Sequence, residues 1–286
     1  MQGILLSGGL GTRLQPITSV TSKQLLPVYD KPLIYYPLST LMLSGVTDIC
    51  VVTTPEHSTA HQDLLGDGSQ WGLRIKYAVQ NEPLGIPDAF NCAAPNLDTS
   101  KPCFLILGDN FFYGVGLGRE IFANIKEMFA TCLGFEVANP EEYGVAKFDL
   151  TGKLVEILEK PSDPPSNVAV TGFYHFPMSV FHLVSELKPS SRGELEISDL
   201  LNMYIRNEIL ELRTIERGTV WLDTGTPRSL INAGRYVEVI QERQGLMIGS
   251  PDEVAWRLGL IETSQLERNA MSVIGSDYGR NLLKLI

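Results

Sequence analysis

The chain of 286 residues is 44% hydrophobic and 20% charged, and it carries a formal net charge of −10. This composition is typical of a globular protein and excludes a disordered or fibrous chain. The acidic balance excludes nucleic acid and an anionic membrane surface as the main partners, because both require a basic footprint.

The first half of the chain alternates short apolar runs with helical patterns. We expect strands at residues 3–6, 48–52, 74–79 and 103–107, and helices at residues 33–44, 57–65 and 88–94. This alternation predicts an α/β protein with a Rossmann-like sheet, mixed but mainly parallel, flanked by helices. Ligands collect at the carboxyl ends of such strands, where the glycine-rich turn of residues 7–12 and Asp109 both fall.

The second half starts with an expected helix at residues 117–129. It continues with strands at residues 131–137, 144–148, 155–159, 170–176 and 210–216, helices at residues 196–207 and about 228–242, and a loop at residues 221–225. The sequence Ser250-Pro251-Asp252-Glu253 is a capping-box signature, with serine as the N-cap and glutamate at the third helical position. It predicts a small C-terminal helical appendage after one main domain.

The cysteines are widely spaced and form no CxxC pair: Cys50, Cys92, Cys103 and Cys132. We interpret them as free thiols, mostly buried in apolar strands, in a reducing compartment. The N-terminus has no basic region of a signal peptide, and no apolar run approaches the roughly 20 residues of a membrane span. We therefore expect a soluble, cytoplasmic protein with no membrane partner.

The strongest local signal is Leu6-Ser7-Gly8-Gly9-Leu10-Gly11-Thr12-Arg13-Leu14, followed by Lys23-Gln24-Leu25-Leu26-Pro27. Glycines directly after a strand let backbone N–H groups approach a phosphate, and an arginine and a lysine can then hold its oxygens. The dinucleotide motif G-x-G-x-x-G fails here because Leu14 stands in place of the third glycine. The Walker motif is absent from the chain, which leaves a different kind of phosphate site.

The chain resembles the sugar-phosphate nucleotidyltransferase family, whose signature G-G-x-G-T-R-L…K-x-L-[LV]-P is present at residues 8–14 and 23–27. Further matches continue in order to about residue 262, at residues 64–72, 107–110, 143–145, 159–161, 169–172, 192–197, 221–225 and 242–246. The matching residues most resemble the branch of the family that uses dTTP and glucose 1-phosphate. The resemblance implies a nucleotide-binding part at residues 1–112, a sugar-phosphate-binding part at residues 113–245, and the appendage at residues 246–286.

The family reaction is an in-line attack by a sugar 1-phosphate oxygen on the α-phosphorus of a nucleoside triphosphate, which releases pyrophosphate. Such reactions depend on positioning and on neutralising charge. The resemblance implies that Asp109 and Asp223 hold Mg²⁺ and that Arg13, Lys23 and Lys160 are catalytic. Read singly, Asp109 and Asp223 are ordinary turn residues; the joint match favours the functional interpretation.

The resemblance also implies substrate contacts along both halves of the site. The triphosphate would lie against Gly8, Gly9, Gly11 and Thr12, and the base against Gln24, Gln80 and Gly85. The sugar phosphate would contact Asn110, Tyr143, Gly144, Glu159 and Val170, with Arg192 as a further phosphate contact.

The resemblance implies that the product is dTDP-glucose and that the enzyme is a homotetramer. Formation of this product would be the first step of dTDP-deoxysugar biosynthesis. Two alternatives stay open: the same chemistry with UTP or another sugar 1-phosphate, and a non-catalytic regulatory paralogue that binds nucleotide sugars. Retention of the five charged residues named for catalysis and metal binding argues against the second.

Two positions depart from the family pattern. Pro87 replaces a small residue beside the expected base pocket, which puts base selectivity rather than the fold in question. Val115 stands where relatives commonly have a histidine in a secondary nucleotide site, which in this chain would include Arg217, Glu253 and Arg257. Feedback control by a downstream nucleotide sugar is therefore a hypothesis.

Overall fold

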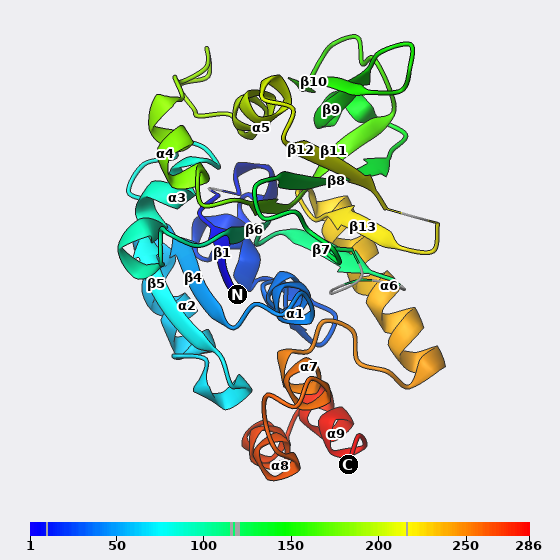
Figure 1. Ribbon diagram of the computed structural model, residues 1–286. Coiled ribbons are helices and arrows are strands. Elements are labelled where there is room, and N and C mark those ends of the chain that lie inside the picture. Colours follow the sequence, from blue (N-terminus) through cyan, green and yellow to red (C-terminus); the bar gives the residue numbers. More distant parts are fainter. Residues whose placement is uncertain (10, 115–116, 118–120, 216) are drawn as a thin grey trace.

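The structure is a computed structural model that describes residues 1–9, 11–114, 117, 121–215 and 217–286, built around a mixed sheet (Figure 1). Within these residues nine strands form the sheet, in the order β10-β9-β11-β6-β1-β4-β5, with β8 pairing to β11 and β12. The strands are β1 Gln2–Ser7, β4 Asp48–Thr53, β5 Arg74–Val79, β6 Cys103–Leu107, β8 Ala130–Glu136, β9 Gly144–Phe148, β10 Leu154–Glu159, β11 Val168–Phe176 and β12 Leu210–Thr214.

The N-terminal half of the sheet is parallel, since β1 pairs in parallel with both β4 and β6, and β4 with β5. Successive side chains of β1 point to opposite faces. Leu5 packs on the side covered by α1 Tyr35–Leu43 and α2 Ser58–Leu65, whereas Ile4 and Leu6 pack on the side of α3 Asp88–Ala93. Burial on both faces explains the apolar runs of β1, β4 and β6, and the predicted α/β sheet flanked by helices is confirmed.

The C-terminal half makes the sheet mixed, because β11 runs antiparallel to β6, β8 and β9. α4 Val180–Leu183 and α5 Ile197–Arg206 follow β11, and α5 places Leu200 and Leu201 in the same core as Ile4. Two small two-stranded sheets complete the described strands: the hairpin of β2 Pro27–Val28 and β3 Lys31–Pro32, and the antiparallel pair of β7 Asn110–Tyr113 with β13 Val220–Asp223.

Two expectations about secondary structure are wrong. The residues described between 117 and 129 form turns and no helix, while residues 118–120 lie outside the described part. The Arg213 guanidinium takes the carbonyls of Ile121 and Ala123 as acceptors, and the buried Phe122 ring packs on Phe104 and Phe173. The first three residues of the expected loop at residues 221–225 belong to strand β13, which pairs with β7.

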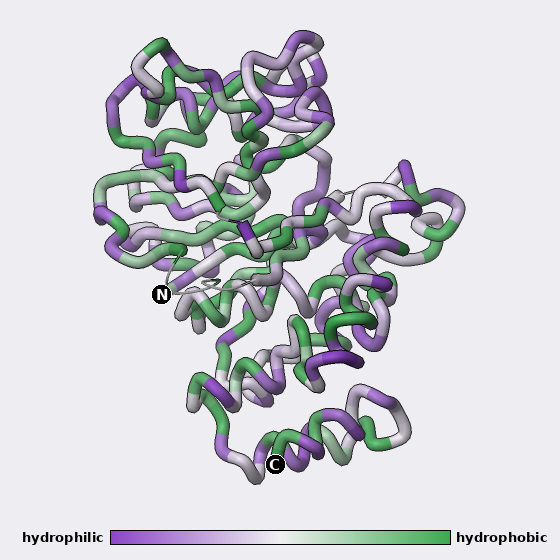
Figure 2. The backbone as a smooth tube through the Cα atoms, turned by 90° about the vertical axis from the view of Figure 1, so that its right-hand side faces the viewer, coloured by the Kyte–Doolittle hydropathy of each residue, from purple (hydrophilic) through white to green (hydrophobic). Residues whose placement is uncertain are grey.

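The C-terminal helices are present as expected: α6 Pro227–Gln244, α7 Pro251–Arg257, α8 Thr263–Ser272 and α9 Asp277–Leu283. Ser250 caps α7 by accepting a hydrogen bond from the Glu253 N–H, while the Glu253 carboxylate pairs with Arg257. α7 packs on α1, and the last three helices lie on one side of the sheet, away from its C-terminal half (Figures 1 and 2). Val254 and Ala255 of α7 belong to the core cluster that contains α1, whereas the buried hydrophobic residues of α8 and α9 form a cluster of their own.

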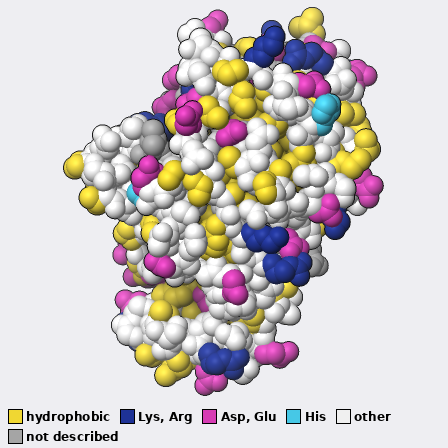
Figure 3. Space-filling view, turned by 90° about the vertical axis from the view of Figure 1, so that its left-hand side faces the viewer, with side chains coloured by type: hydrophobic (Ala, Val, Ile, Leu, Met, Phe, Trp, Pro, Cys, Tyr) yellow, Lys and Arg dark blue, Asp and Glu magenta, His cyan; other side chains and the backbone are white. Residues whose placement is uncertain are grey.

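All four cysteines are free thiols, and Cys50, Cys103 and Cys132 are buried as expected. In the described part of the chain, no helix is both long and apolar enough to cross a membrane. On the face shown in Figure 3, the described lysine and arginine side chains form small separate groups with acidic side chains nearby, and they build no continuous basic surface.

Candidate active site

Two adjoining cavities open where β1 and β6 end. The first, of about 380 Å³, is lined among others by Gly8, Gly9, Gly11, Thr12, Arg13, Lys23, Gln24, Gln80, Gly85 and Asp109. The second, of about 200 Å³, is lined among others by Arg13, Asp109, Asn110, Tyr143, Gly144, Glu159, Lys160, Val170 and Asp223. Because Arg13 and Asp109 line both, the two cavities meet at these side chains. Of the predicted site residues, Arg192 alone lines neither.

A lysine lies between two carboxylates at this junction. Lys23, in the short 3-10 turn Lys23–Leu25, donates to Asp109 Oδ2 at 2.5 Å, and its Nζ is 4.0 Å from Asp223 Oδ1. The Lys23 side chain is 7% exposed, and the two aspartates are 25% and 23% exposed. The structure therefore brings together three charged residues that are far apart in the sequence.

The two carboxylates differ in their electrostatics. Burial alone would raise the pKa of Asp109, but the charge of Lys23 and hydrogen bonds from Lys23 and Asn110 outweigh it and lower that pKa. The pKa of Asp223 is raised, because burial and the negative charge of Asp109 outweigh the charges of Lys23 and Arg13. One lysine thus leaves negative charge at this point that a further cation would neutralise.

The donor chemistry of Asp109 and Asp223 fits a hard divalent cation, which prefers oxygen ligands. Among the described residues, no group of three or more His, Cys, Asp or Glu side chains could hold a metal ion. These two carboxylates would therefore supply the protein's share of the ligands, and phosphate oxygens of the substrates would supply others.

Gly8 and Gly11 of the glycine-rich turn lie where a side chain would be crowded or the backbone strained. A Cβ on Gly8 would lie 2.9 Å from Gln80 Oε1. Gly11 has φ 61°, in the left-handed region that favours glycine, and its carbonyl accepts a 2.8 Å hydrogen bond from Thr18 Oγ1. The exposed Arg13 follows in the 3-10 turn Thr12–Leu14, which directs it to both cavities, while Leu10 lies outside the described residues.

Asn110 acts on Asp109 rather than presenting a free amide. Its Oδ1 accepts hydrogen bonds from Trp221 Nε1 at 2.6 Å and from the Gly172 N–H at 3.0 Å. Its Nδ2 donates to Asp109 Oδ1 at 2.9 Å. Three protein partners therefore fix this side chain, which is 4% exposed, although it borders the second cavity as predicted.

Lys160 adopts a left-handed conformation with φ 43°, which is uncommon for a residue other than glycine. Its N–H donates to the carbonyl of Tyr143 at 2.9 Å, so the end of β10 is tied to the start of β9. Its side chain is 50% exposed, and the ammonium lies 3.9 Å from Glu159. The backbone thus places a cation and a carboxylate at the mouth of the second cavity.

Arg192 lies in a neighbouring hollow with Glu159 and Lys160. Its guanidinium donates to both oxygens of Glu196, at 3.1 and 2.7 Å, and to Glu159 at 3.2 Å. Hydrogen bonding to Glu196 raises the pKa of Arg192 despite its partial burial. In this geometry Arg192 orients Glu159 and does not reach the junction of the two cavities.

The other end of the first cavity carries amide groups. Gln24 Oε1 accepts from Ser22 Oγ at 2.6 Å, and Gln80 Nε2 donates to the Gly85 carbonyl at 3.1 Å. Gly85 has φ 100° and pairs with Leu195, a contact so close that a Cβ would meet the Leu195 backbone. Pro87, with φ −60°, caps α3, so the helix forms as expected.

Gly225 and Trp221 are among the cavity-lining residues that were not predicted individually. A Cβ on Gly225 would lie 2.8 Å from Arg13 Nη2 and 2.9 Å from Asp223 Oδ1. Trp221 packs against Tyr143, with ring centroids 5.1 Å apart, and also holds Asn110. Both lie in the motif Trp221-Leu222-Asp223-Thr224-Gly225, where the glycine two residues after the aspartate could have indicated a close approach.

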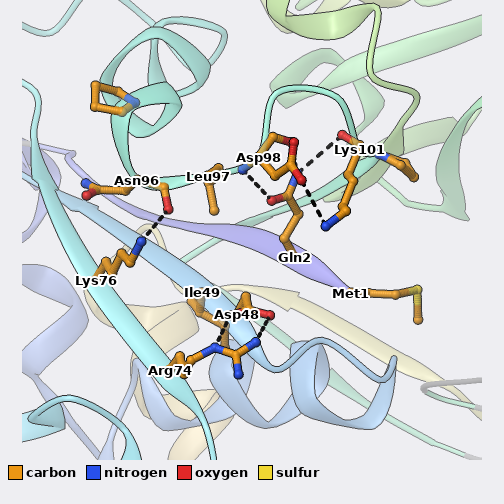
Figure 4. A pocket seen from close by; sticks show the side chains of 12 residues that line it. Met1, Gln2, Asp48, Ile49, Arg74, Lys76, Asn96, Leu97, Asp98 and Lys101 are labelled. Atoms are coloured by element: carbon orange, nitrogen blue, oxygen red, sulfur yellow. Dashed lines mark hydrogen bonds and ion pairs between the residues drawn. The ribbon is translucent and has the colours of Figure 1, made fainter.

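A larger cavity, of about 710 Å³, lies at the opposite, amino-terminal ends of the strands (Figure 4). Its charged side chains pair with one another: Arg74 with Asp48, and Lys101 with Asp98. Lys76 donates to the Asn96 carbonyl at 3.1 Å. Size alone does not mark the active site, because these charged side chains already have hydrogen-bond or ion-pair partners within the protein.

The expected secondary nucleotide site is described only in part. Val115 lies outside the described residues. Glu253 and Arg257 form an ion pair on α7, with Arg257 Nε 2.7 Å from the Glu253 carboxylate. Arg217 lies in the loop between β12 and β13.

The geometry is that of two adjoining cavities whose cationic and acidic side chains suit phosphate groups and a divalent metal ion. The nucleotidyl transferase family matches residues 2–239, and the chain belongs to this family of enzymes. Family members generally use a divalent metal. The resemblance to this family is thereby confirmed.

Two named relatives and two solved structures are similar to this chain. A protein named glucose-1-phosphate thymidylyltransferase from Xanthomonas campestris is 50% identical to this chain, over 99% of this chain and 96% of the relative. A protein of the same name from Mycolicibacterium smegmatis is 47% identical, over 100% of this chain and 99% of the relative. A crystal structure from Bacillus anthracis, named for the same activity and complexed with sucrose, has a TM-score of 0.75 at 40% identity over 82% of this chain and 94% of that one. A UDP-glucose pyrophosphorylase with UDP-glucose, at 24% identity and a TM-score of 0.74 over 83% and 98%, shares the fold.

Proposed function

We propose that the protein transfers a thymidylyl group from dTTP to α-D-glucose 1-phosphate, giving dTDP-glucose and pyrophosphate. The observation that carries this proposal is the junction of the two cavities at Arg13 and Asp109. One cavity has the glycine turn suited to a triphosphate, and the other has polar groups suited to a sugar phosphate. Their meeting point brings the reacting phosphates together.

In the proposed reaction an oxygen of the sugar phosphate attacks the α-phosphorus of the nucleotide in line. The new P–O bond forms as the bond from the α-phosphorus to the bridging oxygen breaks, and pyrophosphate leaves with that oxygen. Arg13 and Lys23 hold the triphosphate and neutralise charge that develops on it. Lys160 holds the sugar phosphate, and Glu159, oriented by Arg192, accepts hydrogen bonds from sugar hydroxyls.

Asp109 and Asp223 would hold Mg²⁺, which supplies positive charge to the phosphate oxygens when bound. Asn110 keeps the Asp109 carboxylate in place through its amide. Because Lys23 lies between both carboxylates, it orients Asp109 toward the junction before substrates arrive.

The proposal includes the wider setting of the reaction. Residues 1–112 would bind the nucleotide, residues 113–245 the sugar phosphate, and residues 246–286 would form a supporting helical unit. We place the enzyme in the cytoplasm, as a homotetramer, at the first step of dTDP-deoxysugar biosynthesis. Inhibition by a downstream dTDP-sugar is part of this proposal, and unchanged initial rates at saturating dTDP-sugar would remove it.

A pyrophosphate-release assay with Mg²⁺ and glucose 1-phosphate tests the proposal. We expect release with dTTP, and comparison with UTP, ATP and GTP measures the strictness for the base. Galactose 1-phosphate in place of glucose 1-phosphate measures the strictness for the sugar. No release above background with any of these nucleotides would show that the protein lacks this activity.

A further inference from the structure

Asp88, the first residue of α3, is buried directly behind the amide of Gln80. Asp88 Oδ2 accepts a 3.0 Å hydrogen bond from Gln80 Nε2, and Asp88 Oδ1 accepts a 3.1 Å hydrogen bond from Asn91. Asp88 is 9% exposed and does not line either cavity of the site. Its carboxylate therefore acts on the site only through Gln80.

The surroundings of Gln80 leave its amide one orientation. Gln80 Nε2 also donates to the Gly85 carbonyl at 3.1 Å. If the amide were turned over, its oxygen would face that carbonyl and the Asp88 carboxylate, and neither of these groups can donate a hydrogen bond. Two acceptors, one of them charged, therefore hold the NH₂ group inward.

The other atom of the amide consequently faces the nucleotide cavity. Gln80 Oε1 lies beside Gly8, where only the absence of a Cβ leaves room for it. Gln80 lines the cavity together with Gly85 and is itself 6% exposed. The cavity thus presents a hydrogen-bond acceptor, and no donor, from this side chain.

We propose that Asp88 is a positioning residue that sets the base preference of the nucleotide cavity through the Gln80 amide. The inference rests on the proposed function, in which the base lies against Gln80. A fixed acceptor pairs with the ring N3–H of thymine or uracil. Cytosine carries a lone pair at ring N3, so two acceptors would face each other in the same pose, and the site rejects it.

Asp88→Asn tests this assignment, because an asparagine can accept or donate, so the variant removes the charged one of the two acceptors that keep the Gln80 amide from turning over. We expect the variant to bind dTTP within about twofold of the unchanged protein and dCTP about tenfold more tightly. The measurement is isothermal titration of each nucleotide with Mg²⁺ and without sugar phosphate. Tighter dCTP binding is a gain that a damaged fold would not produce.

Asn91→Ala is the matched control, since it removes the hydrogen bond to the other oxygen of Asp88 from an exposed side chain and leaves Oδ2 facing Gln80. We expect its dTTP-to-dCTP affinity ratio to equal that of the unchanged protein. The ratio does not depend on the fraction of each preparation that is folded.

The inference is overturned if Asp88→Asn leaves the ratio unchanged, if it weakens both nucleotides equally, or if the unchanged protein binds dTTP and dCTP alike. Failure of the proposed function is a separate result, because it shows as absent pyrophosphate release while nucleotide binding persists. Binding and turnover therefore report on the two proposals independently.

Discussion

At the scale of single residues, the site is defined by an imbalance of charge. Lys23 is 2.5 Å from Asp109 but 4.0 Å from Asp223, and the pKa of Asp223 is raised by burial and by the nearby Asp109 carboxylate. Such repulsion between carboxylates lowers stability, and a bound cation would relieve it. The chain as a whole carries a charge of −10, yet Arg13, Lys23 and Lys160 gather at this point.

Asp223→Asn removes one carboxylate from the junction while keeping its shape. We expect turnover to fall by about two orders of magnitude or more, and the Mg²⁺ concentration for half-maximal rate to rise. Thermal unfolding should stay unchanged or shift upward, because the repulsion with Asp109 is lost. Asp149→Asn, in an exposed turn, is the control, and near-normal turnover of Asp223→Asn would contradict the proposal that this residue holds the metal ion.

The buried His175 side chain makes the stability of the folded protein depend on pH. Burial lowers the pKa of His175 to about 4, from an ordinary value near 6.5, and the residue is 5% exposed. Between these values the unfolded chain binds the proton and the folded chain does not, so stability is full above pH 6.5 and falls as the pH drops toward 4. The loss reaches about 3 kcal/mol at the lower end.

Urea unfolding between pH 5 and 7 measures this contribution. His175→Gln should be less stable overall but show a flatter dependence on pH, because the titrating group is gone. His182→Gln, with an exposed side chain, should keep the original slope. Equal slopes for the unchanged protein and His175→Gln would contradict the assignment.

At the scale of elements, several strands of the main sheet are predictable from sequence, and the β7–β13 pair is not. β5, β6 and β9 have the bounds that the sequence predicts for them. β7 and β13 have four residues each and lie more than a hundred residues apart. Phe111 of β7 and the partly buried Leu222 of β13 pack against α6 and the β2–β3 hairpin instead of joining the main sheet, so no local period reveals them.

The site, too, has features that the sequence predicts and features that it does not. The glycine turn, Lys23 and the two aspartates were predictable as a set from the motifs that carry them. The hydrogen bonds that orient them were not, because each joins distant segments: Trp221 to Asn110, and Thr224 Oγ1 to the Asp109 carbonyl at 2.8 Å. The register of β13 on β7, which sets Asp223 opposite Asn110, is what brings the carboxylates together.

Trp221→Phe tests the role of this strand pair. The ring still packs on Tyr143, but Asn110 Oδ1 loses its 2.6 Å donor and holds Asp109 less firmly. We expect kcat to fall about tenfold, with a raised requirement for Mg²⁺ and a small change in thermal stability.

Trp256→Phe is the matched control, since its Nε1 bonds Thr263 at an exposed position outside the site. It should leave kcat unchanged. If the two variants have the same kcat, then the Trp221 hydrogen bond does not support Asp109.

At the scale of the whole molecule, a buried lysine connects the hairpin to the C-terminal helices. Lys31 on β3 pairs with Asp30 and donates to Gln241 of α6 at 3.1 Å. Its ammonium also lies over the rings of Tyr36 of α1 and Tyr278 of α9, 5.1 and 5.7 Å from their centroids. The Lys31 and Asp30 side chains are 1% and 7% exposed, so four elements meet around a charge shielded from water.

Lys31→Met leaves the Asp30 carboxylate buried with Gln241 as its remaining side-chain partner. We expect the free energy of unfolding to fall by about 3–5 kcal/mol, and the double variant with Asp30→Asn to recover part of this loss. Lys147→Met, which breaks an exposed pair with Glu156, should cost less than about 1 kcal/mol. Because Lys31 contacts α1, α6 and α9 together, we expect Lys31→Met to unfold in urea in a single cooperative transition, at a lower urea concentration than the unchanged protein. If helix content is instead lost in a separate, earlier transition while activity is retained, then the C-terminal helices unfold on their own.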